Sequence, residues 1–219
     1  MHHRSTQLAV PRGHPPPTQI PAEFSDYVQV YEIVDSDFPG YVYLVLRYLL
    51  TECTDDGTCR YTCFTYDTGN KLYLSLSTRP PDDDRQSIHG PALQTKNTTI
   101  LSVDCVRCVR CLSWPPQAAD WPTRHRNYGW PDSATVDRVA NNGCDVVHVA
   151  HRHNRQDEWE SERQWRLSFS RAEIVLLNSW MPVQQIVCHM LRVFVKTELL
   201  KDSDSSEGLS NYHIKTSMM

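Results

Sequence analysis

Apolar and polar residues alternate along several short segments in the first half of the chain. Residues 27–31 read Tyr-Val-Gln-Val-Tyr, residues 41–46 read Tyr-Val-Tyr-Leu-Val-Leu, and Pro39-Gly40 lies between them. Because side chains alternate between the two faces of a strand, this pattern predicts two β-strands joined by a turn. Residues 71–76 and 99–109 have the same character and predict two more strands.

The period changes toward that of a helix in two places further along the chain. Asp132 is placed to cap a short helix that ends near Gly143, and residues 144–149 return to a strand pattern. Apolar residues recur at helical spacing over residues 183–195, which predicts a longer helix. Strands followed by helices indicate an α+β fold.

Composition divides the chain into three regions. Residues 1–25 hold five prolines and little periodic apolar content, so they are predicted to form a disordered arm outside the core. We expect a sheet domain over residues 26–169 and a helical lobe over residues 170–219. Leu209 begins another helical pattern that is left incomplete, and we therefore expect a chain truncated at both ends.

Charge and composition argue against several classes of protein. The chain has 22 basic and 26 acidic residues and a formal charge of −4, which gives no global attraction for nucleic acid. No apolar run has the length of a membrane span and the N-terminus lacks a signal-peptide core, so we expect a cytoplasmic or nuclear location without membrane contact. The eight cysteines are then expected to be free thiols.

Several sequence blocks carry a more specific signal. Residues 165–173 read Trp-Arg-Leu-Ser-Phe-Ser-Arg-Ala-Glu, and residues 210–216 read Ser-Asn-Tyr-His-Ile-Lys-Thr. Ser102-Val103-Asp104 lies upstream of Trp114-Pro115, and residues 128–132 read Tyr-Gly-Trp-Pro-Asp. In this order and spacing the blocks resemble the signature of the Mab-21-like family, which contains the cyclic GMP-AMP synthase-like nucleotidyltransferases.

The resemblance implies a nucleotidyltransferase-type twisted mixed β-sheet with an incomplete C-terminal helical lobe. It implies that ATP or GTP binds with Mg²⁺ or Mn²⁺ in the cleft between the lobes, and that active members make cyclic dinucleotides in innate immune signalling. Asp104 matches a catalytic carboxylate that binds the metal. The positions that match nucleotide-binding residues of the family are Arg166, Ser168, Ser170, Glu173, Arg192 and Lys215.

The residue types at these positions suit a nucleotide. Arg166 can stack on a base or fork to its carbonyl edge, whereas Arg192 and Lys215 can neutralise phosphates. Glu173 can accept a hydrogen bond from a base or a ribose. A structural role stays open, because Ser170-x-x-Glu173 has the form of a helix capping box and Arg192 is also compatible with a solvated helix face.

Nucleotidyl transfer needs two divalent cations and therefore a cluster of carboxylates. Active relatives use three carboxylates, and two of them follow a Gly-Ser loop that cradles the phosphates. No Gly-Ser pair precedes Pro39-Gly40 in this sequence. Asp35 and Asp37 have a suitable D-x-D spacing, yet their place beside the turn favours a turn role, and Asp26 is a weaker remnant.

Three functions are compatible with these observations. The first is a catalytically impaired Mab-21-like protein, which the missing phosphate loop and two missing carboxylates favour. The second is an active Mg²⁺-dependent enzyme that uses Asp35, Asp37 and Asp104 to make cyclic dinucleotides from ATP and GTP. The third is a non-enzymatic scaffold that binds a nucleotide or a protein partner, whose identity the sequence does not indicate.

Cysteine spacing predicts no zinc site. Cys105, Cys108 and Cys111 follow each other at Cys-x-x-Cys spacing, but an extended strand turns Cys105 and Cys108 to opposite faces, and buried thiols are the favoured interpretation. Some relatives grip DNA with a zinc insertion where this chain has only residues 178–182. The missing insertion and the acidic charge argue against double-stranded nucleic acid as a partner.

Overall fold

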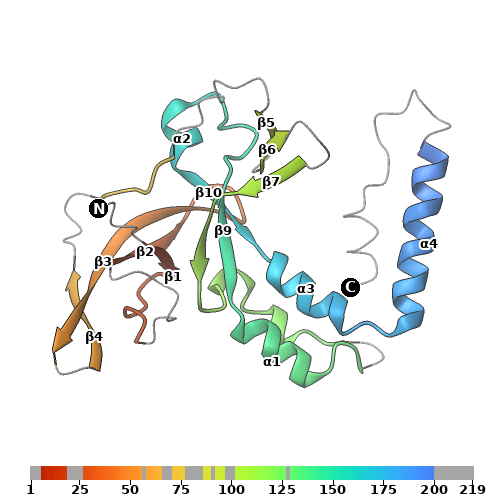
Figure 1. The fold of residues 1–219 in the computed structure, drawn as a ribbon, viewed down its shortest axis with the longest axis horizontal. Coiled ribbons are helices and arrows are strands. Elements are labelled where there is room, and N and C mark those ends of the chain that lie inside the picture. Colours follow the sequence, from red (N-terminus) through yellow and green to blue (C-terminus); the bar gives the residue numbers. More distant parts are fainter. Residues whose placement is uncertain are drawn as a thin grey trace.

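The computed structural model describes residues 6–18, 27–55, 58–65, 71–76, 86–89, 92–96, 102–126 and 129–199. Its main sheet has the strand order β10-β9-β8-β1-β2-β3-β4, and its second sheet has the order β5-β6-β7 (Figure 1). The strands of the main sheet are β1 (Thr6–Val10), β2 (Tyr27–Asp35), β3 (Tyr41–Asp55), β4 (Thr58–Thr65), β8 (Cys108–Cys111), β9 (Cys144–His148) and β10 (Gln164–Ser168). Those of the second sheet are β5 (Gln86–His89), β6 (Ala92–Lys96) and β7 (Ser102–Val106).

Helices follow and interrupt the strands of the main sheet, so the chain has the α+β fold that the sequence predicts. The α-helices of the described residues are α1 (Ser133–Asn141), α2 (Glu158–Arg163), α3 (Ser170–Asn178) and α4 (Pro182–Leu199). Two short 3-10 helices, η1 (Pro116–Ala118) and η2 (Trp121–Thr123), lie between β8 and α1.

Six strands of the main sheet close into a ring. β10 pairs with β9 on one side and with the beginning of β3 on the other, so the order β1-β2-β3-β10-β9-β8 returns to β1. β1 is parallel to both β2 and β8, whereas the other pairs in the ring are antiparallel. A closed ring leaves these strands few unpaired backbone groups, and it separates an inner face from an outer one.

The inner face of the ring is the main hydrophobic core, and every strand of the ring contributes to it. Its buried residues are Ala9, Tyr31, Ile33, Val42, Leu44, Leu74, Val109, Cys111, Cys144, Val146, Trp165 and Leu167. A second cluster lies on the other side of β1 and β2, at Leu8, Val10, Val28, Val30 and Leu50. Apolar residues therefore occupy both faces of these two strands.

Alternation along β2 and a β-bulge in β3 explain how these two strands serve both clusters. The register of β2 with β3 shifts between Val30 and Tyr31, and both side chains are buried. Val30 lies opposite Tyr48 and Tyr31 lies opposite Leu46, so the extra residue, Arg47, is in β3. Ordinary alternation places Val28 and Val30 in the second cluster and Tyr31 and Ile33 in the ring interior. The bulge lets β3 contribute Val42 and Leu44 to the ring interior and Leu50 to the second cluster.

Predictions that depend on neighbouring residues are confirmed. β2 and β3 are joined by a turn in which Gly40 has a φ of 80°, a conformation that glycine adopts without strain. The Asp132 carboxylate caps α1 by accepting a hydrogen bond from the Thr135 amide at 2.7 Å. Cys144–His148 is a strand, and the long predicted helix is α4.

The predicted disordered arm over residues 1–25 is wrong for Thr6–Val10, which form β1 at the centre of the sheet. Leu8 is 0% exposed, and β1 hydrogen-bonds to β2 and β8. A strand buried on both faces has a short apolar run and no alternation, so periodicity does not reveal it. Residues 19–26 lie outside the described residues, and the domain boundaries at 26 and 170 stay predictions.

The single strand predicted over residues 99–109 is also corrected. β7 and β8 lie on either side of Arg107 and pair in different sheets. Residues 71–76 lie beside β3, joined to it by a bridge between Val45 and Tyr73, and they do not form a regular strand. Continuous alternation therefore did not mark the point at which the chain leaves one sheet for the other.

The capping box predicted at the start of α3 is wrong. Phe169 occupies the N-cap position and no side chain caps it, so Ser170 is the first residue of the helix. α3 is held instead by packing: Ala172 and Leu176 form a cluster with Val139 of α1. Three tryptophans of the connecting segments, Trp114, Trp121 and Trp130, pack against this cluster.

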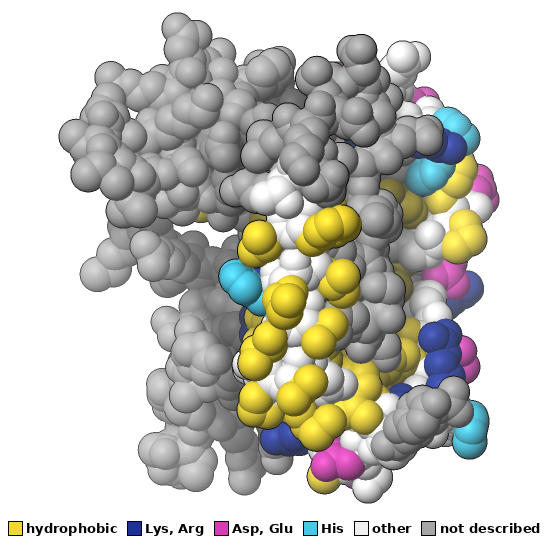
Figure 2. Space-filling view, turned by 90° about the vertical axis from the view of Figure 1, so that its right-hand side faces the viewer, with side chains coloured by type: hydrophobic (Ala, Val, Ile, Leu, Met, Phe, Trp, Pro, Cys, Tyr) yellow, Lys and Arg dark blue, Asp and Glu magenta, His cyan; other side chains and the backbone are white. Residues whose placement is uncertain are grey.

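α4 extends away from the ring (Figure 1) and exposes much of its apolar surface. Figure 2 shows these apolar side chains gathered along one side of the helix. The exposed apolar side chains of this region are Met181, Val183, Ile186, Val187, Met190, Leu191, Val193 and Phe194. Within the described residues, no helix combines the length and apolarity that crossing a membrane requires.

Candidate functional site

Arg166 and Ser168 lie on the outer face of the ring. Their neighbours Trp165 and Leu167 belong to the inner core, where Trp165 is 1% exposed. Because side chains alternate along a strand, Arg166 and Ser168 point to the opposite side. Arg166 is exposed and Ser168 is partly buried.

Strand register sets which side chains accompany them on this outer face. Ser168 of β10 lies opposite Asp145 of β9, and Asp145 lies opposite Arg110 of β8. In the next row, Arg166 lies opposite Val147 on one side and opposite Tyr41 of β3 on the other. The outer face of β8, β9 and β10 therefore carries charged residues, and the inner face of the same strands is apolar.

Asp145 is the centre of a charged network on this face. Its carboxylate is almost buried and accepts two hydrogen bonds from Arg171 Nε, at 2.9 and 3.2 Å. Arg110 Nη1 lies 3.7 Å from the same carboxylate. Arg110 also donates to the carbonyl oxygens of Cys144 and Asn142, which fixes it against the start of β9.

The network perturbs the groups beside it. Burial lowers the pKa of Arg110, and the nearby guanidinium of Arg171 lowers it further, while Asp145 opposes both effects. Although the Cys108 side chain is exposed, partial desolvation by its neighbours raises the pKa of its thiol, and the Asp145 carboxylate adds to that effect. Two guanidinium groups therefore share one carboxylate, and positive charge exceeds negative charge in this network.

The segment from β10 into α3 places two hydroxyl groups next to the network. Ser168 Oγ donates to Ser170 Oγ at 3.5 Å, and Ser170 is the residue before Arg171. The first amide hydrogen bond within α3 runs from Glu173 to the Phe169 carbonyl. Ser168, Ser170 and Glu173 thus stand close together in space as well as in sequence.

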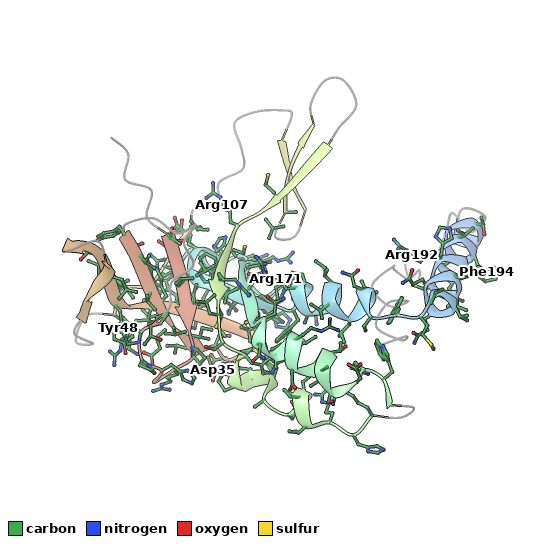
Figure 3. All side chains as sticks on the ribbon, turned by 60° about the horizontal axis from the view of Figure 1, so that its bottom comes forward. Asp35, Tyr48, Arg107, Arg171, Arg192 and Phe194 are labelled. Carbon is green, nitrogen blue, oxygen red and sulfur yellow. The ribbon has the colours of Figure 1, made fainter. Side chains whose placement is uncertain are left out.

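The other predicted residues are not brought to this face. Arg192 lies on α4, and Figures 1 and 3 show α4 beyond the far end of α3. Lys215 lies outside the described residues. Asp104 is on β7, where its backbone is paired with Gln94, and its side chain is likewise outside the described part of the structure.

Asp35 and Asp104 lie toward opposite ends of the strands. β8, β1 and β2 run in the same direction, with Arg110, Leu8 and Val30 at one level. Asp104 precedes β8, whereas Asp35 ends β2 and accepts a hydrogen bond from Gln117 at 2.6 Å. Cys108 begins β8 two residues before Arg110, and Asp35 lies five residues after Val30, so at about 3.3 Å per strand residue these two ends of the sheet are about 23 Å apart.

Asp35 therefore cannot share a metal ion with Asp104, and Figure 3 shows it on the side of the ribbon away from β7. Asp37 lies in the same turn, where the Ser36 hydroxyl oxygen accepts a hydrogen bond from the Phe38 amide. The turn role predicted for Asp35 and Asp37 agrees with this geometry. The expectation that an active enzyme uses both with Asp104 is wrong.

The cysteine prediction is partly corrected. Cys111 is buried in the ring core, but Cys105 and Cys108 are exposed. These two cysteines lie on either side of Arg107, where the chain passes from β7 to β8. Among the residues that the structure describes, no three His, Cys, Asp or Glu side chains form a group suited to a metal ion.

Comparison with protein families adds one finding to this geometry. The family model of the Mab-21 protein nucleotidyltransferase domain matches residues 64–179, more than half of the 219-residue chain. The chain belongs to this family. The matched Mab-21 region includes β8, β9, β10 and α3, the elements that build the charged outer face.

Sequence reasoning missed Arg110, Asp145 and Arg171. Asp145 interrupts an apolar strand pattern, Cys-Asp-Val-Val-His, and Arg110 does the same in Cys-Val-Arg-Cys. A lone charge in a buried strand of a Mab-21 domain needs a partner, so each interruption was a signal. The identity of the partner depends on strand register, which the sequence does not display.

Proposed function

We propose that this Mab-21 domain binds a nucleoside triphosphate, ATP or GTP, on the outer face of β8–β10, and that it is impaired in nucleotidyl transfer. The observation that carries the proposal is the convergence of Arg166, Ser168 and Ser170 beside the Asp145 network. Membership of a nucleotidyltransferase-domain family supports nucleotide binding by this chain. Glu173 completes the set as an acceptor for a base or ribose hydroxyl.

Each side chain has a distinct role in this proposal. Arg166 is exposed and offers a planar guanidinium, which stacks on a base or donates a forked pair of hydrogen bonds. The hydroxyls of Ser168 and Ser170 are small donors that fit ribose or phosphate oxygens. The rigid sheet holds Arg166 and Ser168, and α3 holds Ser170, so little side-chain ordering is needed on binding.

The described carboxylates do not fit the Mg²⁺ or Mn²⁺ ions that family members use. Asp145 is engaged by two arginines, and Asp35 is bound to Gln117 at the other end of the strands. A cation would have to displace those partners to gain oxygen ligands. This arrangement of the described carboxylates supports the proposal that nucleotidyl transfer is impaired.

Calorimetric titration with ATP and with GTP tests the proposal, with chromatographic analysis of the same samples for products. We expect binding without dinucleotide product in the wild type and at least tenfold weaker binding in Arg166→Ala. Arg155→Ala is the matched control, because Arg155 is also an exposed arginine but lies in the loop between β9 and α2. Equal loss in both variants, or no binding by folded protein, contradicts the proposal and favours a protein scaffold.

A second candidate function, complete nucleotidyl transfer, is favoured by one observation. Tyr27 is the first residue of β2 and lies one residue before the level of Thr6. This is also the end of the sheet at which β8 begins, directly after β7. Asp26 precedes Tyr27 in the sequence and lies outside the described residues. An Asp26→Asn variant that loses a dinucleotide product made by the wild type supports this function, and absence of product from the wild type contradicts it.

The proposal extends to the cellular setting of the protein. We propose a cytoplasmic location, with the nucleus as the alternative, and a role in nucleotide-dependent immune signalling. Microscopy of the fluorescently tagged chain tests the location. Secretion of the tagged chain contradicts it.

A further inference from the structure

Arg171 has donor groups that its ion pair leaves available. Both of its hydrogen bonds to Asp145 use Nε, at 2.9 and 3.2 Å. The side chain is nevertheless 48% exposed, so its outer edge faces solvent. An arginine has five N–H donors in a planar fork, and this geometry turns the two terminal nitrogens away from the carboxylate.

Arg110, the other arginine of the network, is used differently. Its Nη1 donates to the Cys144 carbonyl at 2.9 Å, and its Nη2 donates to the Asn142 side-chain oxygen at 3.1 Å. Its side chain is 17% exposed. Arg110 therefore holds Asp145 and the start of β9 in place, while Arg171 presents charge at the surface.

The charge balance of the network favours an added anion. Two guanidinium groups face the single carboxylate of Asp145, and the repulsion between them contributes to the lowered pKa of Arg110. An anion bound to the outer edge of Arg171 would offset this excess. Short range and partial burial make such an interaction stronger than it is in bulk water.

The neighbouring hydroxyls suit an anion with several oxygen atoms. Ser168 lies opposite Asp145 in the sheet, and Ser170 precedes Arg171 on α3. Their hydroxyl oxygens are 3.5 Å apart, so one phosphate group can accept hydrogen bonds from both and from the guanidinium, once the Ser168 hydroxyl turns from Ser170 to the phosphate. A carboxylate ligand has fewer oxygens with which to use all three donors.

We propose that Arg171 binds a phosphate group of the nucleotide and that Asp145 is its positioning residue. This inference rests on the function proposed above, because it assigns the phosphate end of the same ligand. Asp145 fixes the guanidinium through Nε, so that both terminal nitrogens point to one place before the ligand arrives. Preorganisation of this kind reduces the loss of side-chain freedom on binding.

The test compares ligands that differ only in phosphate number. Affinities for adenosine, AMP, ADP and ATP are measured by calorimetry on the wild type and on Arg171→Gln. We expect wild-type affinity to rise with phosphate number, and Arg171→Gln to reduce the ratio between ATP and adenosine by about tenfold or more. Adenosine affinity should stay unchanged, which a general loss of structure would not allow.

Arg124→Gln is the matched control. Arg124 also donates through Nε to an aspartate, Asp120, at 2.9 Å, but it lies in the segment after η2. Its substitution should leave the ratio between ATP and adenosine unchanged. If Arg124→Gln lowers this ratio as much as Arg171→Gln does, general loss of positive charge explains the effect and the inference is overturned.

Two further variants separate positioning from packing. Arg171→Lys keeps the charge but loses the fork, and should restore only part of the ATP to adenosine ratio. Asp145→Asn should lower that ratio in an Arg171 background but have no further effect in Arg171→Gln. If Arg171→Lys and Asp145→Asn both retain the wild-type ratio, Asp145 does not position a phosphate ligand.

The two levels of the hypothesis fail in different ways. Folded wild-type protein that binds neither adenosine nor ATP overturns the proposed function, and the phosphate role of Arg171 with it. ATP binding with an unchanged phosphate dependence in Arg171→Gln overturns the inference alone. In that case the Arg171–Asp145 pair only joins α3 to the sheet.

Discussion

The two faces of β8, β9 and β10 carry side chains of opposite character on one shared backbone. The inner face is apolar and sealed, with Val109, Val146 and Trp165 inside the ring. The outer face carries Arg110, Asp145, Arg166 and Ser168, in register across the same strands. The comparison teaches that the inner face determines the fold, and that the outer face is available for chemistry without loss of the core.

The largest effect is expected from opening the inner face. Trp165→Ala removes a fully buried ring and the hydrogen bond from its Nε1 to the Leu74 carbonyl at 3.1 Å. We expect a loss of about 3–5 kcal/mol in the free energy of unfolding, from lost burial and the cavity left behind. Urea denaturation followed by tryptophan fluorescence and circular dichroism measures it, and a loss below about 1 kcal/mol contradicts a sealed interior.

A smaller loss of stability is expected from Asp145→Asn on the outer face. The substitution leaves Arg110 half-buried beside a neutral amide, and it weakens the contact with Arg171. We expect a loss of about 2 kcal/mol, below the value for a fully buried ion pair because Arg171 is partly solvated. Asp120→Asn breaks an exposed pair and should change stability by less than about 0.5 kcal/mol in the same denaturation experiment.

Acidic pH should lower the stability of the folded protein through protonation of His148, the last residue of β9. Burial lowers the pKa of His148 below its usual value of 6.5, although the Glu162 carbonyl 3.0 Å from Nε2 opposes the shift. The unfolded chain then binds more protons, so stability is retained above about pH 6.5 and lost as the pH falls below it. Melting temperatures at pH 7.5 and 5.5 should differ by several degrees more in the wild type than in His148→Gln.

The smallest effect is expected on α4, whose apolar residues resemble those of the inner face in type but not in burial. Phe194 is 62% exposed, so Phe194→Ser should change the free energy of unfolding by less than about 0.5 kcal/mol. Chemical denaturation of the monomeric protein measures this change. A loss above about 1 kcal/mol would show that the phenyl ring is covered in solution, and the contrast with Trp165 would be lost.

Local patterns predicted much of the fold. The alternation in β2 and β3, the Asp132 cap and the helical spacing in α4 each depend on residues close in sequence. β1 was missed because its stability comes from pairing with β2 and β8, which are far away along the chain. The capping box failed at α3 because Phe169 packs between the ring core and the helices.

The candidate site was predictable in part. The motif of residues 165–173 identified Arg166, Ser168 and Ser170, and alternation alone places Arg166 and Ser168 on one face. The Asp145 carboxylate, 26 residues before Arg171, becomes its neighbour only through the pairing of β9 with β10. For Asp35, correct spacing was misleading, because its position at the end of β2 separates it from Asp104.

The central claim is that the charged outer face binds a nucleoside triphosphate through Arg166. Calorimetric titration of ATP into wild-type protein and into Arg166→Ala tests it most directly. The account predicts one binding event per wild-type chain, and an affinity at least tenfold lower in a variant with unchanged melting temperature. Equal affinity in the two proteins, or no heat of binding from folded wild-type chain, would contradict it.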